Sequence, residues 1–204
     1  MHQYKGKLIL HTGSMFSGKT SSLEKDLNRF KIANYKVVAY KPSVDKRSAE
    51  DSIVTHDDRV VSAIAVDCIE TLVEDVLKKD YEVIGIDEAQ FINGGAEKIR
   101  DEVAKLLNLG KTVVVAGLDM DFSGNAFENI KELMPIADYV YKHHAVCTGC
   151  GADAWVSHRK VNVEDRFLLG ASNEYEPLCR TCYEAIKKEE EKPVNKNQIE
   201  IEIE

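Results

Sequence analysis

The sequence predicts an α/β fold in which helices cover both faces of a parallel sheet, with a small cysteine-bearing lobe attached. Short apolar runs alternate with segments of helical periodicity over the first two thirds of the chain, a pattern typical of strand–helix–strand units. The run at 113–116 is apolar at every position, as expected for a strand buried on both faces. Near residue 145 the composition changes to an irregular segment that contains pairs of cysteines.

The expected elements follow one another in order along the chain. Residues 7–12 form an apolar run that predicts a strand, and 18–34 predict a helix because their apolar residues recur at helical spacing. A later helix is expected to end where Gly110 stops it. The other expected elements are strand 36–40, helix 69–79, strand 81–86, helix 95–109, strand 112–116 and strand 139–141.

These elements divide the chain into three expected parts. They are an α/β domain at 1–145, a lobe at 146–186 and a charged tail at 187–204. The tail is rich in Lys and Glu, so we expect it to be solvated. Its end alternates Ile and Glu at strand period and could extend a sheet edge, but a frayed terminus is the favoured interpretation.

The composition excludes several classes of protein. With 44% hydrophobic and 30% charged residues among 204, the chain can form a core and is not disordered as a whole. A formal net charge of -8 excludes a generally basic surface, so no nucleic-acid partner is expected. The chain has neither a run of about 18 apolar residues nor the apolar region of a signal peptide. We therefore expect no membrane association and a cytoplasmic location.

A phosphate-binding motif lies between the first expected strand and helix. It matches G-x-x-x-x-G-K-[ST], in which glycines let successive backbone N–H groups point at one phosphate. Lys19 would neutralise the β and γ oxygens, and the Thr20 hydroxyl would bind Mg²⁺. A chance glycine-rich turn is the alternative, but the strand and helix around the motif favour a nucleotide site in a P-loop (RecA-like) sheet. The motif comprises Gly13, Ser14, Met15, Phe16, Ser17, Gly18, Lys19 and Thr20.

Two acids end the apolar strand at 81–86. Asp87 is the candidate to hold Mg²⁺ opposite the Thr20 hydroxyl. Glu88 points differently and can act as general base for a hydroxyl or a water. An acidic turn without chemical duty is the alternative, which the phosphate motif makes less favourable. These residues predict a Mg²⁺-dependent user of nucleoside triphosphate, and leave open whether it is a kinase or an NTPase.

Four of the five cysteines form two Cys-x-x-Cys pairs with 28 residues between them, and this spacing predicts a structural zinc site. Such a site would anchor a zinc-ribbon-like lobe too short to bury its own core. The lobe has four basic and six acidic residues between 147 and 186, which argues against nucleic acid as its ligand. Cys68 stands alone and is expected to be a small buried hydrophobe. The expected zinc ligands are Cys147, Cys150, Cys179 and Cys182.

Five motifs occur together in one order, and together they resemble the zinc-containing, cytosolic-type (type II) thymidine kinases over residues 8–182. The motifs are residues 13–20, Lys41-Pro42-x-x-Asp45-x-Arg47, residues 85–91, residues 117–122 and the two cysteine pairs. The resemblance implies that ATP donates its γ-phosphate to the 5′-hydroxyl of thymidine or deoxyuridine. It also implies a homotetramer that the end product dTTP inhibits.

The resemblance assigns roles to individual residues. Glu88 matches the general base, Lys19, Thr20 and Asp87 match the phosphate and Mg²⁺ groups, and Gln90 closes the strand-end motif. Asp45 and Arg47 match positions near the nucleotide phosphates, and Phe122 matches the aromatic residue that packs on the substrate. The residues that match the loop around the thymine, whose ends the zinc holds, are Arg166, Phe167, Leu168, Leu169, Gly170 and Tyr175.

Two positions depart from the family pattern. Ser14 stands where the family usually has proline, and Asn125-Ala126-Phe127 replaces a proline-containing sequence after Gly124. Neither position is expected to carry chemistry.

Two other functions remain open at this level. One is a P-loop ATPase with a zinc ribbon that acts on nucleic acid or on a protein, and the other is a catalytically inactive nucleotide sensor. The acidic lobe argues against the nucleic-acid version of the first, and the complete set of Lys19, Thr20, Asp87 and Glu88 argues against the second.

Overall fold

A computed structural model describes residues 4–44, 63–161 and 173–190. Asp45, Arg47, residues 166–170 and the end of the charged tail, all named above, lie outside the described residues. Among the described residues, no helix is both long enough and apolar enough to cross a membrane.

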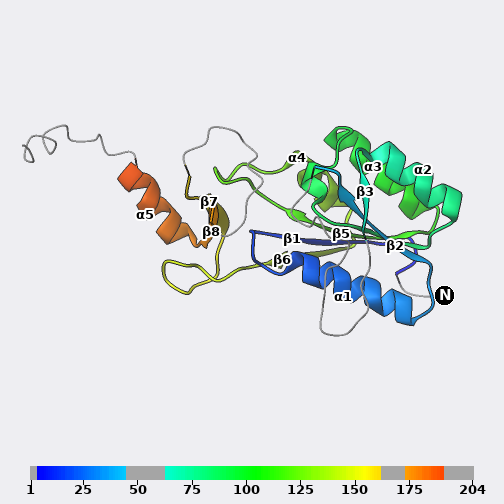
Figure 1. Ribbon diagram of the computed structural model, residues 1–204, viewed down its shortest axis with the longest axis horizontal. Helices are drawn as coiled ribbons and strands as arrows, with labels where there is room; N and C mark the ends of the chain where they lie inside the picture. Colours follow the sequence, from blue (N-terminus) through cyan, green and yellow to red (C-terminus); the bar gives the residue numbers. More distant parts are fainter. Residues whose placement is uncertain (1–3, 45–62, 162–172, 191–204) are drawn as a thin grey trace, which may run out of the picture.

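The main domain is built on six parallel strands in the order β3-β2-β4-β5-β1-β6 (Figure 1). The central strands are buried along nearly their whole length, which explains their unbroken apolar sequence. The predicted α/β class with a parallel sheet is therefore confirmed. The strands are β1 Leu8–Gly13, β2 Val37–Pro42, β3 Ala63–Val66, β4 Val83–Ile86, β5 Thr112–Leu118 and β6 Tyr139–His143.

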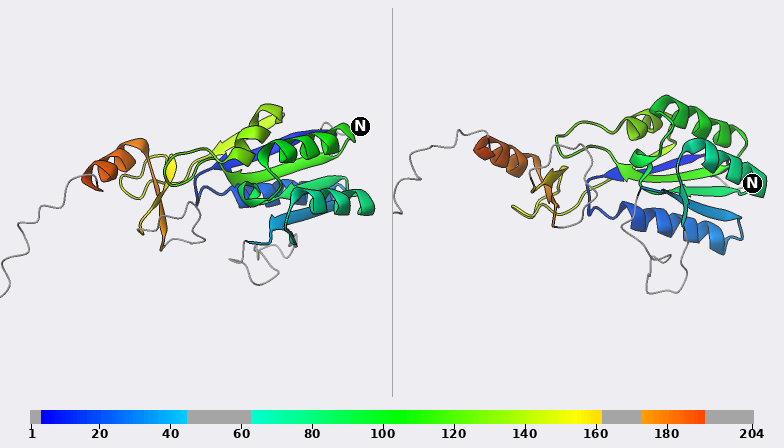
Figure 2. Two further views of the ribbon diagram at one scale, coloured as in Figure 1. Left: turned by 90° about the horizontal axis from the view of Figure 1, so that it is seen from above. Right: turned by 45° about the horizontal axis from the view of Figure 1, so that its top comes forward.

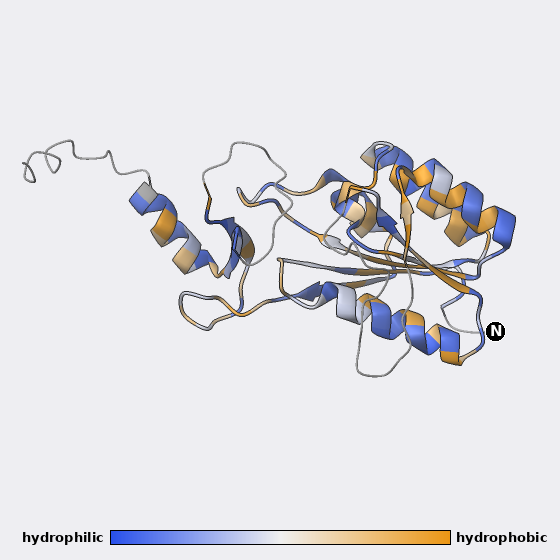
Figure 3. Cartoon of the chain, viewed as in Figure 1, coloured by the Kyte–Doolittle hydropathy of each residue, from blue (hydrophilic) through white to orange (hydrophobic). Residues whose placement is uncertain are grey.

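Helices cover both faces of this sheet, as predicted. Helix α1 (Lys19–Ile32) packs on one face, and α2 (Ile69–Lys79), α3 (Ala96–Asn108) and α4 (Glu128–Leu133) pack on the other (Figure 1). Hydrophobic and hydrophilic residues alternate along these helices (Figure 3), and most of their buried residues are apolar. Two 3₁₀ turns, η1 (Ala89–Phe91) and η2 (Met134–Ile136), complete the domain.

A close approach fixes α1 against the sheet. A Cβ atom on Gly85 of β4 would lie 2.5 Å from a methyl carbon of Leu27, so only glycine lets the helix pack at this depth. Leu27 is buried, together with Leu23 and Phe30 on the same side of α1. This packing holds α1, whose first residue Lys19 belongs to the phosphate motif, against the sheet.

The lobe contains a two-stranded antiparallel sheet and one helix. Strands β7 (Val156–Arg159) and β8 (Tyr175–Leu178) pair, and α5 (Arg180–Glu190) follows directly. The lobe lies beside the end of the main sheet where β1 runs into α1 (Figure 2). The sequence indicated no helix here, and α5 runs past residue 186, where the composition placed the start of the tail.

Three further differences concern the main domain. Strand β3 was not expected, because it is a short edge strand with two exposed residues and no alternating pattern. The short α4 was also not expected. Cys68 is only partly buried and stands at the N-terminal cap of α2 with its Sγ 3.3 Å from Thr71 Oγ1, so the expectation of a buried hydrophobe is wrong.

Candidate functional site

The phosphate motif forms a tight loop between β1 and α1. Gly13 has φ 136°, and a Cβ atom there would lie 2.1 Å from the carbonyl oxygen of His143 in β6. Gly18 caps α1 in the left-handed region with φ 80°. Both glycines are therefore required for the loop to curl between two strands and a helix.

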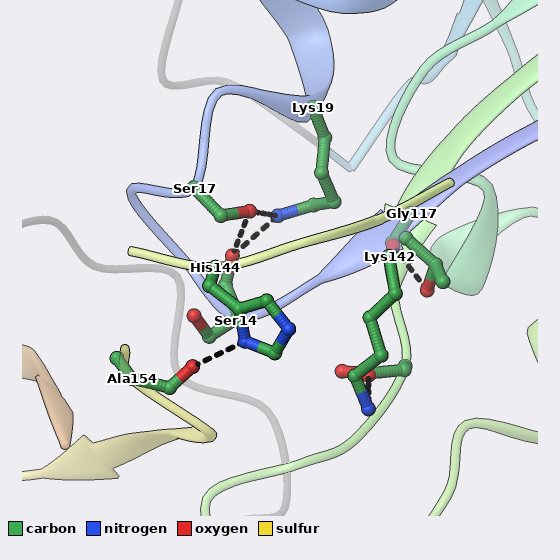
Figure 4. Close-up of polar contacts among 9 residues, drawn as sticks. Ser14, Ser17, Lys19, Gly117, Lys142, His144 and Ala154 are labelled. Atoms are coloured by element: carbon green, nitrogen blue, oxygen red, sulfur yellow. Dashed lines mark hydrogen bonds and ion pairs between the residues drawn. The ribbon is translucent and has the colours of Figure 1, made fainter. Parts of the chain in front are cut away.

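Lys19 is buried and points back into this loop. Its Nζ donates to the Ser14 carbonyl oxygen at 2.6 Å, and the Ser17 hydroxyl donates to the same oxygen at 2.8 Å (Figure 4). Ser14 therefore contributes its backbone carbonyl oxygen to the loop, at a position where the family usually has proline. The ammonium group lies within the curl, where a nucleotide phosphate would find both charge and backbone donors.

Thr20 and Asp87 meet across the carboxyl edge of the sheet. The Thr20 hydroxyl lies 3.1 and 3.2 Å from the two Asp87 carboxylate oxygens, and Asp87 also accepts from the backbone N–H of Glu88 at 2.9 Å. Burial and the neighbouring Glu88 charge raise the pKa of Asp87 to about 7. A hydroxyl and a carboxylate are hard oxygen ligands, so this pair fits the partial coordination that Mg²⁺ takes from proteins beside a phosphate.

Glu88 is held at the same edge in a strained conformation. Its backbone adopts φ 48°, and its Oε2 accepts a short hydrogen bond from Gln90 Nε2. The Gln90 Oε1 in turn accepts from the backbone N–H of Leu118 at 3.0 Å. A Cβ atom on Gly117 would lie 2.9 Å from Gln90 Oε1, so this glycine makes room for the amide. Gln90 therefore ties the candidate base to β5.

The four lobe cysteines converge. Their Sγ atoms all lie within 4.8 Å of one another, and those of Cys150 and Cys179 are 3.6 Å apart. Four sulfurs about 2.3 Å from a tetrahedral Zn²⁺ would be about 3.8 Å apart, so the cluster fits this ion. The neighbouring sulfurs raise the pKa of Cys182 to about 12, and a divalent cation at the centre would let all four thiols ionise together.

The lobe contacts the phosphate loop and the segment after β5. The Ser157 hydroxyl of β7 accepts from the backbone N–H of Met15 at 2.8 Å. The Tyr183 hydroxyl of α5 donates to the carbonyl oxygen of Phe122 at 2.9 Å. The first contact bridges 142 positions and the second 61, so the lobe joins parts that are remote in the chain.

The segment that carries Phe122 is also fixed from within. The Asp121 carboxylate accepts from the backbone N–H groups of Ser123 and Asn125 at 3.0 and 2.9 Å, which forms a tight turn. Asp119, at the start of the segment, pairs with Lys142 of β6 at 2.9 Å. The turn that replaces the family's proline therefore has its own support.

Phe122 and Tyr175, both assigned to the substrate, contact the same arginine. Both contact the buried guanidinium of Arg159, which stacks on the Phe122 ring and hydrogen bonds to the Tyr175 hydroxyl. Sequence reasoning did not single out Arg159, Ser157 or Tyr183. Only Tyr183 gave a signal, because it lies next to a predicted zinc ligand at helical spacing from Cys179.

The comparisons with known proteins agree with this site. The family model described as thymidine kinase matches residues 6–183. The chain is 42% identical to the thymidine kinase of Bacteroides thetaiotaomicron over 179 residues, which are 88% of this chain and 87% of that protein. It is also 42% identical to the thymidine kinase of Rhodothermus sp. (strain ITI 518) over 172 residues, or 84% and 78% of the two chains.

A solved structure shows the same fold at low identity. The crystal structure of the flagellar accessory protein FlaH from Methanocaldococcus jannaschii is 12% identical, has a TM-score of 0.51 and aligns over 85% of this chain and 87% of that chain. The likeness concerns the fold alone. The family model and the two relatives cover most of the sequence, and on their evidence the chain belongs to the thymidine kinase family and is a phosphotransferase.

Proposed function

We propose that this chain transfers the γ-phosphate of ATP to the 5′-hydroxyl of thymidine or deoxyuridine, giving the monophosphate and ADP for pyrimidine deoxynucleotide salvage. The observation that carries the proposal is the gathering of Lys19, Thr20, Asp87 and Glu88 at one edge of the sheet. Phe122 and Tyr175 both contact Arg159 of β7, the strand whose Ser157 contacts the phosphate loop. The first three groups suit a triphosphate, the fourth suits an alcohol, and the rings suit a flat base.

The phosphate loop would bind the triphosphate. Lys19 would leave the Ser14 carbonyl oxygen and place its ammonium on the β and γ oxygens, while the loop N–H groups bind the same oxygens. Thr20 and Asp87 would hold Mg²⁺, which supplies positive charge to the transferred group. Asp45 and Arg47 are proposed to contribute near the phosphates.

Glu88 would be the general base. Its carboxylate takes the proton of the 5′-hydroxyl as the oxygen bonds to the γ-phosphorus and the bond from that phosphorus to the β-phosphate oxygen breaks. The hydrogen bond from Gln90 would keep the Glu88 carboxylate oriented, a role beside the cofactor contact that the sequence predicts for Gln90. The 5′-oxygen thus loses its proton to Glu88 as it gains the phosphoryl group.

The lobe would bind the nucleoside. Phe122 would pack on the base, and Tyr175 with residues 166–170 would enclose it, while zinc on the four cysteines holds the ends of this loop together. The homotetramer, inhibition by dTTP, the absence of a nucleic-acid partner and the cytoplasmic location stay predictions.

A scan of nucleosides in a coupled ADP-release assay tests the proposal. Thymidine and deoxyuridine should stimulate ADP release, and purine nucleosides should not. Stimulation by DNA, RNA or a protein without any dependence on nucleoside would instead indicate the ATPase. ATP binding without turnover of any acceptor would indicate the sensor.

A further inference from the structure

A buried arginine lies between the two aromatic residues that we assign to the substrate. Arg159 is the last residue of β7, and only 6% of it is exposed. Its Nε and one terminal nitrogen donate to the Tyr175 hydroxyl at 3.2 and 2.8 Å. Its guanidinium carbon lies 3.9 Å from the centroid of the Phe122 ring and 5.4 Å from that of Tyr175. One side chain therefore contacts both aromatic groups.

The two residues reach Arg159 from different parts of the fold. Tyr175 lies directly opposite Arg159 in the β7–β8 ladder, which puts their side chains on one face of the small sheet. Phe122 comes from the segment after β5 in the main domain, where the Tyr183 hydroxyl also holds its backbone. Arg159 thus joins the lobe to the main domain at the proposed nucleoside site.

The chemistry of these contacts requires a guanidinium. Its planar group can stack on a ring with one face while its edge donates two hydrogen bonds to one oxygen. A lysine ammonium at the same place would keep the charge but lose the stacked face and the fixed pair of donors. Because the group is buried, its contacts are not weakened by solvent as those of a surface arginine are.

We propose that Arg159 is a positioning residue for nucleoside binding, which holds the Phe122 ring and the Tyr175 hydroxyl in one fixed geometry. This inference rests on the proposed function. Arg159 acts through these two side chains, so its loss should weaken binding of the nucleoside and leave the chemical step unchanged. The phosphate loop is built from other contacts, so the KM for ATP should not move.

The variant Arg159→Lys tests this role. We expect the KM for thymidine to rise about tenfold, with kcat and the KM for ATP changed less than about twofold. Zinc content and Tm, measured on the same samples, show whether the lobe is intact. Arg180→Lys is the matched control, since Arg180 also stacks on an aromatic ring of the lobe, Trp155 at 4.1 Å, and the KM for thymidine should stay within about twofold there.

A second variant keeps the inference testable if Arg159→Lys fails to fold. Tyr175→Phe removes only the hydroxyl that accepts from Arg159, and should raise the KM for thymidine without lowering kcat. In the double variant, the increase should be smaller than the product of the two single increases, because both changes break the same contact.

If the wild-type enzyme phosphorylates thymidine, three results would overturn the inference. They are an unchanged KM in a folded Arg159→Lys or Tyr175→Phe variant, a fall in kcat at constant KM, and single effects that multiply in the double variant. A wild-type enzyme that phosphorylates no nucleoside would instead overturn the proposed function, and the inference with it.

Discussion

The main domain and the lobe reach their shapes by different means. The main domain has apolar cores on both faces of its sheet, and its phosphate loop follows directly from a buried strand and is held mainly by contacts within the loop, those of Lys19 and Ser17 with the Ser14 carbonyl oxygen. The lobe has a much smaller buried cluster. Its members are Ala145, Cys147, Ala154, Val156, Leu178 and Tyr183. We expect a cluster of this size to depend on a metal at the four cysteines for a fixed structure. On the proposed function, the nucleotide side of the site should therefore be preformed, and the nucleoside side should depend on the four cysteines.

The largest effect is expected at the general base Glu88, which must reach both the nucleotide and the nucleoside. Glu88→Gln keeps the size of the side chain and an oxygen that can accept from Gln90 Nε2, but its amide cannot act as a base, so kcat should fall by about 10² or more. ATP binding, measured by equilibrium titration, should remain largely intact because Lys19 and Thr20 are unchanged. Turnover equal to wild type would remove Glu88 from the mechanism.

Removal of the metal should separate the two regions. Cys182→Ser deletes one of four converging sulfurs, so zinc content should fall, and the KM for thymidine should rise by about tenfold or more as the lobe loosens. ATP binding should change much less than thymidine binding, since the phosphate loop has its own internal contacts and the lobe contacts it through the hydrogen bond between Ser157 and the Met15 N–H. Cys68→Ser is the control, because Cys68 lies apart from the cluster, and it should leave zinc content and both KM values unchanged. Loss of ATP affinity to the same extent as thymidine affinity would show that the two regions do not act independently.

A further test within the main domain concerns the orientation of the Glu88 carboxylate by Gln90. Gln90→Ala removes the donor to Glu88 and the acceptor for the Leu118 backbone N–H. A hydrogen bond to a charged group contributes about 1.5–3 kcal/mol, so kcat should fall by about tenfold or more, with a smaller change in the KM for thymidine. A steady-state comparison with Gln90→Glu, which retains the acceptor but places a second acid beside Glu88, separates the two contacts. If kcat is unchanged in the alanine variant, Glu88 does not need Gln90.

The sequence predicted the nucleotide side of the site well. The carboxyl ends of parallel strands meet at one edge, so a phosphate motif after β1 and two acids after β4 had to come close together. The four cysteines were also found, because Cys-x-x-Cys spacing is a local pattern. By contrast, the contacts of Ser157, Arg159 and Tyr183 join residues far apart in the chain, and no local pattern predicts such pairs.

Helix α5 was missed for a different reason. Its apolar positions Cys182, Tyr183 and Ile186 do recur at helical spacing. Two of the cysteines, however, fit a metal knuckle equally well, and the lysines and glutamates after residue 186 fit a solvated tail. The cysteine pattern at the start of the helix and the charged composition at its end each indicated another structure, so the helical periodicity was not recognised.

The smallest expected effect lies where α5 meets the main domain. Tyr183→Phe removes the hydroxyl that donates to the Phe122 carbonyl oxygen and keeps the ring that packs in the lobe. A neutral hydrogen bond contributes about 0.5–1.5 kcal/mol, so the KM for thymidine should rise about threefold while zinc content and kcat stay constant. Because Phe122 is also held through its ring by Arg159, the loss of one contact should loosen the residue without releasing it. An effect as large as that of Cys182→Ser would mean that the lobe reaches the substrate mainly through Tyr183, whereas no effect would leave the ring contact as the principal link between the two regions.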